Sequence, residues 1–108
     1  MVDAALLAAI LDSLKDPVLV ADTSHVTCYM NRAAIAHYEQ GAGLLGRSLL
    51  ECHNAQSQQM MFEILAAMRQ GLEERLITDN ERVRIFMRAV RGPEGELLGY
   101  YERYEPKV

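Results

Sequence analysis

The sequence predicts an α+β domain: a five-stranded antiparallel sheet with helices packed on one face and an amphipathic helix at the N-terminus. The chain has 108 residues, the size of one domain, and half of them are apolar. Turn residues separate two short apolar runs early in the chain and three late in it, with helical patterns between them. Two hairpins separated by helices do not suit a doubly wound α/β fold, which needs alternating strands and helices.

Charge and composition argue against several classes of function. The net charge is −4 at pH 7 and the basic residues are scattered, whereas nucleic-acid binding needs a clustered basic face. No apolar run approaches the ~20 residues that span a bilayer, and no signal segment opens the chain. We therefore expect a cytoplasmic protein with no direct nucleic-acid or membrane partner. Cys28 and Cys52 are too far apart for a CxxC metal site, so we expect reduced thiols and no bound metal.

The N-terminal segment, residues 1–15, is predicted to form a helix from about Asp3 to Leu14, ahead of a domain over residues 16–108. Asp3 suits the N-cap because its carboxylate accepts from free N–H groups of the first turn. Pro17 ends the pattern. A short apolar helix must bury its stripe, either on its own domain or against the same helix of a second chain. The candidate dimerisation residues are Leu7, Ile10, Leu11 and Leu14.

A first hairpin and short helices are predicted next. Pro17–Ala21 is rich in β-branched residues, which favour a buried strand. Val26–Met30 follows after a polar turn, with Val26, Cys28 and Met30 alternating against Thr27 and Tyr29. Asn31 is predicted to cap a short helix over Arg32–Tyr38, and Leu44–Leu50 can hold only a short helical turn.

The longest helix is predicted from Asn54 to Gly71. Asn54 or Ser57 can cap its start, because a short polar side chain accepts from the first-turn N–H groups. Apolar residues at three- and four-residue steps share one face. These residues are Met61, Ile64, Leu65 and Met68. A helix with methionines on its inner face can form one wall of a pocket.

Three strands are predicted late in the chain, over residues 73–78, 82–89 and 97–105. The middle one shows the clearest alternation, as expected of a half-buried strand. Its apolar positions are Val83, Ile85, Met87 and Ala89. The alternate positions, on the opposite face of the same strand, include Arg82, Arg84 and Arg88. These arginines either present cations to an acidic partner or form a solvated sheet face.

Catalytic chemistry has little support in the sequence. Cys52 and His53 are neighbours, and the side chains of adjacent residues usually point apart rather than meet as nucleophile and base. The acidic pairs Glu73–Glu74 and Glu94/Glu96 are expected to be solvated, as are His25 and His37. We therefore expect no enzyme activity.

Three segments carry a recognisable arrangement: LDSLKDPVLVADTSHVTCYMNRAA, LLGRSLLEC and AVRGPEGELLGYYE. The first matches a "D-x-V-x-V-x-D" run and a "Y-x-N-x-A" helix start, and the second matches "(I/L)-G-(R/K)-S". The matching residues are Asp16, Asp22, Tyr29, Asn31, Ala33 and Leu45–Ser48. In this order and at these spacings the motifs resemble the PAS domain family over nearly the whole chain.

This chain resembles one PAS subgroup more closely, because it shares two further motifs with that subgroup. The subgroup has a Cys-His-(Pro/Asn)-x-x-Ser segment before the main helix and an Ala-Val-Arg-x-x-x-Gly-Glu-x-x-Gly hairpin near the end. This chain has Cys52-His53-Asn54 with Ser57, and Ala89-Val90-Arg91 with Gly95-Glu96 and Gly99. Asn54 stands where the subgroup usually has Pro, so the start of the main helix is expected to differ slightly.

The resemblance implies a sensory or regulatory module in signal transduction or transcriptional control, which dimerises and works with another signalling protein or effector domain. PAS domains share a cavity between the sheet and the main helix. This cavity holds haem, flavin or a metabolite in some members and nothing in others. The apolar composition favours a small apolar ligand or none. The open alternatives are a cofactor-free protein–protein interaction module and a haem sensor that uses His53 or a Met. The candidate cavity residues are Cys52, His53, Met61, Leu65 and Met87.

Cofactor-specific residues are mostly missing. The flavin photosensors of the family carry an "N-C-R-F-L-Q"-type segment, and no Arg-Phe-Leu-Gln follows Cys52. The haem sensors carry an axial His within the main helix, where this chain has Met60 and Met61. His53 lies just before the helix, and a neutral imidazole is a good iron ligand.

Overall fold

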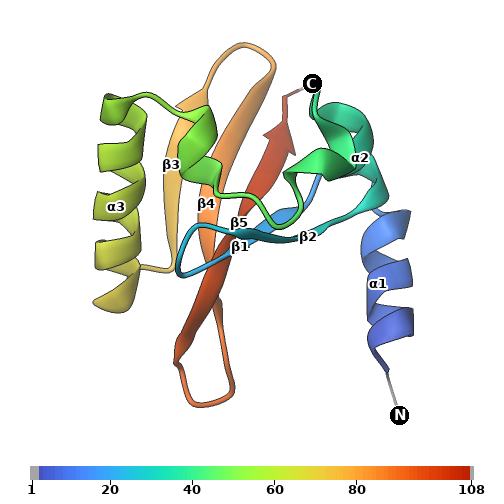
Figure 1. Cartoon of the computed structure of the whole chain (residues 1–108), viewed down its shortest axis with the longest axis horizontal. Coiled ribbons are helices and arrows are strands. Elements are labelled where there is room, and N and C mark those ends of the chain that lie inside the picture. Colours follow the sequence, from blue (N-terminus) through green and yellow to red (C-terminus); the bar gives the residue numbers. More distant parts are fainter. Residues whose placement is uncertain (1–2, 108) are drawn as a thin grey trace.

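The computed structural model describes residues 3–107 and contains one five-stranded antiparallel sheet (Figure 1). The strand order is β2-β1-β5-β4-β3, so the last strand of the chain lies at the centre of the sheet. The strands are β1 (Leu19–Asp22), β2 (Thr27–Met30), β3 (Glu74–Asp79), β4 (Val83–Arg91) and β5 (Leu97–Pro106). The predicted sheet and fold class are confirmed.

The helices fall on two flanks of the sheet. Figure 1 shows α3 beside β3 and β4, the short helices running from it towards α2, and α1 on the flank opposite α3. The helices are α1 (Ala4–Ser13), α2 (Arg32–His37), α3 (Ala55–Arg69) and the 3₁₀ turns η1 (Gly41–Leu44) and η2 (Leu49–Cys52). Each α-helix is capped as expected, since Asp3, Asn31 and Asn54 each accept from a first-turn backbone N–H.

The alternation expected in the second strand is shifted by a bulge. Val20 pairs with Tyr29, whereas its neighbour Ala21 pairs with Thr27, so Cys28 is an extra residue on β2. A bulge leaves one residue unpaired and changes the side-chain phase after it. Thr27 is therefore buried and Cys28 exposed, the reverse of the order expected from alternation.

The buried side chains form two clusters on the inner face of the sheet. The larger one, under α3, includes Ile64, Met68, Met87 and Tyr100. The smaller one, under α2 and η1, consists of Leu19, Met30, Ala34 and Leu44. Leu49 packs against both clusters, so η2 covers the space between them.

Asn31 is a fully buried amide whose four hydrogen bonds join three segments of the chain. Its Oδ1 accepts from the N–H of Val18 and of Ala34, both at 2.9 Å. Its Nδ2 donates to the carbonyls of Leu11 at 2.9 Å and Asp16 at 3.1 Å. The side chain therefore fixes the end of α1, the start of β1 and the first turn of α2 relative to one another.

We expect Asn31→Asp to destabilise the fold by roughly 2–4 kcal/mol, because a carboxylate has no N–H for the two carbonyls and is repelled by them. Urea unfolding measures the change. The matched control is Asn80→Asp, since Asn80 uses only its Oδ1, which accepts from two backbone N–H groups in an exposed turn. An equal loss of stability in the two variants would contradict the role assigned to Asn31.

Candidate ligand cavity

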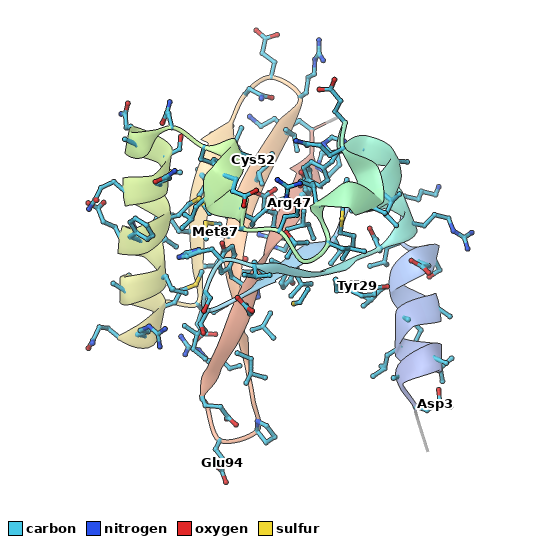
Figure 2. The ribbon with its side chains drawn as sticks, viewed as in Figure 1. Asp3, Tyr29, Arg47, Cys52, Met87 and Glu94 are labelled. Carbon is cyan, nitrogen blue, oxygen red and sulfur yellow. The ribbon has the colours of Figure 1, made fainter. Side chains whose placement is uncertain are left out.

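A partly open cavity of about 170 Å³ lies on the inner face of the sheet. The sheet supplies Leu19, Met87 and Tyr100, α3 supplies Met61, and Leu49 of η2 closes the opposite side. In Figure 2, Met87 lies by the sheet and Cys52 lies on the η2 segment above it. The cavity therefore occupies the gap between the two core clusters, where η2 passes over the sheet.

The depth of the cavity follows from the burial of its lining. Met61, Met87 and Tyr100 are buried, whereas Cys52 and His53 are exposed and lie at the mouth. The interior is mostly apolar, and thioethers contribute much of its wall. Methionine side chains are flexible and polarisable, so such a wall adapts to ligands of different shape.

The structure brings four of the five sequence-predicted cavity residues together. Cys52, His53, Met61 and Met87 all line the cavity. Leu65 does not: it lies one helical turn beyond Met61, where it packs in the core under α3. Helical spacing placed Met61 and Leu65 on the same face, but only the first turns of α3 lie over the cavity.

Four lining residues that carry polar groups were missed by the sequence reasoning: Tyr38, Gln40, Tyr100 and Glu102. Tyr38 caps the C-terminus of α2, and Glu102 lies opposite Met87 in the sheet. The signal for Glu102 is the alternation of β5, because a strand that points Tyr100 inward must also point Glu102 and Tyr104 inward.

The Glu102 carboxylate is held by two tyrosine hydroxyls. Tyr38 donates to Glu102 Oε2 at 2.9 Å, and Tyr104 donates to the same oxygen at 3.3 Å. The two hydroxyl oxygens also lie at hydrogen-bond distance, 2.8 Å apart, so their two protons are shared among three contacts. These contacts join α2 to the central strand, so this cluster forms a polar end of the cavity.

Both tyrosines are held in the protonated form. Burial raises the pKa of Tyr38 far above its ordinary value, and the negative charge of Glu102 adds to the effect. Burial also raises the pKa of Tyr104 to about 12, although its hydrogen bond with Tyr38 opposes the shift. Both hydroxyls therefore keep their protons at neutral pH and can donate hydrogen bonds within this cluster.

The second carboxylate oxygen, Glu102 Oε1, receives no hydrogen bond from residues 3–107. No lysine, arginine or histidine of that range forms an ion pair with Glu102 either. His53 is the only basic residue in the lining. The described part of the cavity therefore contains a carboxylate without a cation beside it.

The charges on the outer face of the sheet, by contrast, neutralise one another. Arg103 donates to Glu74 at 2.9 Å and to Glu105 at 2.9 Å, and it lies 4.3 Å from the centre of the Phe86 ring. Arg88 also pairs with Glu74. Glu74 is thus not simply solvated, as expected from sequence, and the hydrogen bond from Arg103 lowers its pKa.

Two of the three arginines predicted as a row, Arg84 and Arg88, are also paired. Arg84 lies 3.7 Å from both Asp79 and Glu105, and Arg88 lies 3.5 Å from Glu74. Such exposed pairs contribute only ~0–1 kcal/mol each to stability, but they leave Arg82 as the one arginine of the row with no ion pair among residues 3–107. Of the two readings, a solvated and neutralised sheet face fits these contacts better than a cationic docking site.

The expectation that His25 is solvated is wrong. Its side chain is 4% exposed, and its Nδ1 lies 2.8 Å from the Tyr100 hydroxyl. The ring also meets Phe62 of α3 edge-on, with 5.6 Å between the ring centres. The turn folds inward because the backbone N–H of Leu49 donates to the His25 carbonyl at 2.8 Å. His37 is exposed, as expected.

The residues present do not fit haem. The cavity, at about 170 Å³, is below the ~300–1,000 Å³ of sites for drug-sized ligands, and haem is larger than most of these. No histidine lies in α3. The nearest one, His53, is exposed at the mouth, and its Nδ1 donates to the Leu49 carbonyl at 2.6 Å.

Residues 3–107 contain no group of three or more His, Cys, Asp and Glu side chains placed to hold a metal ion. Within this range, the helices are also too short or too polar to cross a bilayer.

Comparison with solved structures shows what this arrangement is similar to. The C-terminal domain of a protein from Streptococcus mutans aligns with a TM-score of 0.79 and 18% identity, over 97% of this chain and 85% of that chain. The PAS domain of BvgS from Bordetella pertussis aligns with a TM-score of 0.62 and 18% identity, over 96% of this chain and 85% of that chain. The Aer2 receptor from Vibrio cholerae, a dual PAS-heme oxygen sensor, aligns with a TM-score of 0.57 and 14% identity, over 85% of this chain and 94% of that chain.

The chain has the PAS-domain fold, as the sequence motifs indicated. At these identities the likeness concerns the fold alone. No protein-family model and no curated protein matches the sequence.

We expect the stability of the protein to fall as the pH is lowered from 7.5 to 5.5. Burial lowers the pKa of His25 below its usual 6.5, and Asp22 only partly opposes this. Between the His25 pKa of the folded chain and that of the unfolded chain, the unfolded chain therefore binds more protons than the folded one. The free energy of unfolding decreases as the pH is lowered through that window.

Urea unfolding at several pH values measures this slope. His25→Asn should flatten it, and Asn tolerates the positive φ of 65° at this position. His37→Asn, at an exposed position, is the control and should keep the wild-type slope. Equal slopes in wild type and His25→Asn would contradict this assignment.

Proposed function

We propose that this protein is a sensory PAS module, cytoplasmic and non-enzymatic, that binds a small molecule in its cavity and signals through a partner chain or effector. The observation that carries the proposal is the cavity of about 170 Å³ between the sheet, α3 and η2. Solved proteins of the same fold include a sensor histidine kinase from Vibrio cholerae. This comparison supports a role in signal transduction or transcriptional control.

The size of the cavity favours a compact ligand. An engineered apolar cavity of ~150 Å³ in another protein is large enough to bind benzene. Binding can be transmitted because α3 and η2 both line the cavity and both pack on the sheet. A ligand that fills the space would favour one relative position of these elements over others, which is the usual basis of a population shift.

We expect small molecules that enter the cavity to shift the NMR signals of a particular subset of methionine methyl groups. Met60, Met61 and Met87 line the cavity, whereas Met30 and Met68 are buried outside its lining. A fragment library titrated into protein with ¹³C-labelled methionine methyls provides the measurement. If no fragment moves the first three signals selectively, the cavity is not a ligand site, and the cofactor-free interaction module becomes the better description.

We also propose that α1, in the segment 1–15, pairs with the same helix of a second chain. None of its described residues is buried, and Leu7, Ile10 and Leu14 are 53%, 49% and 44% exposed. The C-terminal half of α1 is attached to the domain, because the backbone N–H of Arg32 donates to Asp12 Oδ1 and Asn31 Nδ2 donates to the Leu11 carbonyl. The helix is thus attached to the domain at one end and leaves its apolar stripe uncovered.

We expect Leu7→Glu with Ile10→Glu to convert a dimer into a monomer, because two charges would be buried in an apolar contact. Light scattering coupled to size-exclusion chromatography measures the mass. Ala5→Glu with Ala9→Glu adds the same charge on the opposite side of α1 and should leave the dimer intact. A wild-type protein that is already monomeric at high concentration would contradict pairing through α1.

A further inference from the structure

The polar end of the cavity has the chemistry of a cation site. Glu102 is partly buried on the inner face of the central strand, where an ionised carboxylate is costly without partners. The two tyrosine donors both bond to Oε2. Oε1 accepts no hydrogen bond from residues 3–107, and Glu102 is part of the cavity lining.

The charge of Glu102 has no counterpart in the described residues. The neighbouring arginine on β5, Arg103, points to the outer face, where Glu74 and Glu105 already neutralise it. Gln40 and Cys52 of the lining carry no positive charge, and the basic lining residue, His53, is exposed at the mouth with its Nδ1 bonded to the Leu49 carbonyl. A cationic ligand would supply the missing charge, whereas an anionic one would meet Glu102 directly.

The rest of the lining fits the apolar part of such a ligand. Beyond Glu102 the wall consists mainly of aliphatic and thioether side chains, including Leu19, Leu44, Met61 and Met87. Thioether sulfurs make favourable contacts with aromatic rings, and the rings of Tyr38 and Tyr100 offer faces that attract cations. The volume admits a body about the size of one six-membered ring.

We propose that the cavity selects a small organic cation, a primary ammonium group on a compact apolar body, and that Glu102 is its counter-ion. The ammonium donates to Glu102 Oε1 while Tyr38 and Tyr104 keep Oε2. The apolar body lies among the methionines. This inference rests on the proposed function, since it names the chemical class of ligand for the same cavity.

The test compares benzylamine, which is protonated at pH 7, with benzyl alcohol and toluene, which are nearly the same size and neutral. Each is titrated against the methionine methyl signals. We expect benzylamine to bind wild type roughly tenfold or more tightly than benzyl alcohol, the increment typical of a hydrogen bond to a charged partner. Glu102→Gln should remove this preference while retaining the binding of toluene.

Glu105→Gln is the matched control, because it removes the same charge from the outer face of the same strand and should keep the preference. If toluene and benzyl alcohol bind at the cavity methionines as tightly as benzylamine does in wild type, the cation inference is overturned and the ligand cavity stands. If none of the three shifts those signals while other fragments do, the inference alone fails. If no fragment does, the proposed function fails with it.

Discussion

The cavity depends on one buried amide some distance from it. The four hydrogen bonds of Asn31 fix the first turn of α2 to the end of α1 and the start of β1. With its start fixed, the short α2 carries Tyr38 at its C-cap to a position over the central strand. There the hydroxyl meets a carboxylate 64 residues further along the chain. A change at Asn31 would therefore affect the polar end of the cavity as well as the stability of the fold.

The central strand separates two electrostatic environments. On its outer face, Arg103 forms ion pairs with carboxylates from β3 and β5, so positive and negative charges neutralise one another. On its inner face, Tyr100, Glu102 and Tyr104 follow the same period of two, and Glu102 is the only charged residue among them. Because the arginine and its partners lie on the other side of the sheet, the donors to the inner carboxylate from residues 3–107 are hydroxyl groups alone.

The sequence was sufficient for features set by local periodicity. The strands, the capped helices and the place of Met61 and Met87 all follow from spacing and turn residues. What it could not supply depends on contacts between distant segments. The bulge at Cys28 reverses the phase of β2, and the burial of His25 depends on a segment more than twenty residues away crossing over its turn. Glu102 could be placed on the inner face by alternation, but its tyrosine partner on α2 could not.

The partners of the tyrosine hydroxyls explain why one carboxylate oxygen is left open. Tyr100 precedes Glu102 by two residues and points to the same face, so it is a natural third donor. Its hydroxyl is instead bonded to His25, at 2.8 Å, on the β1 side of the strand. The turn that buries His25 thus gives the Tyr100 hydroxyl a partner other than Glu102. Since neither Tyr38 nor Tyr104 has a second proton to give, the acceptor on Oε1 is available to a donor that enters through the cavity.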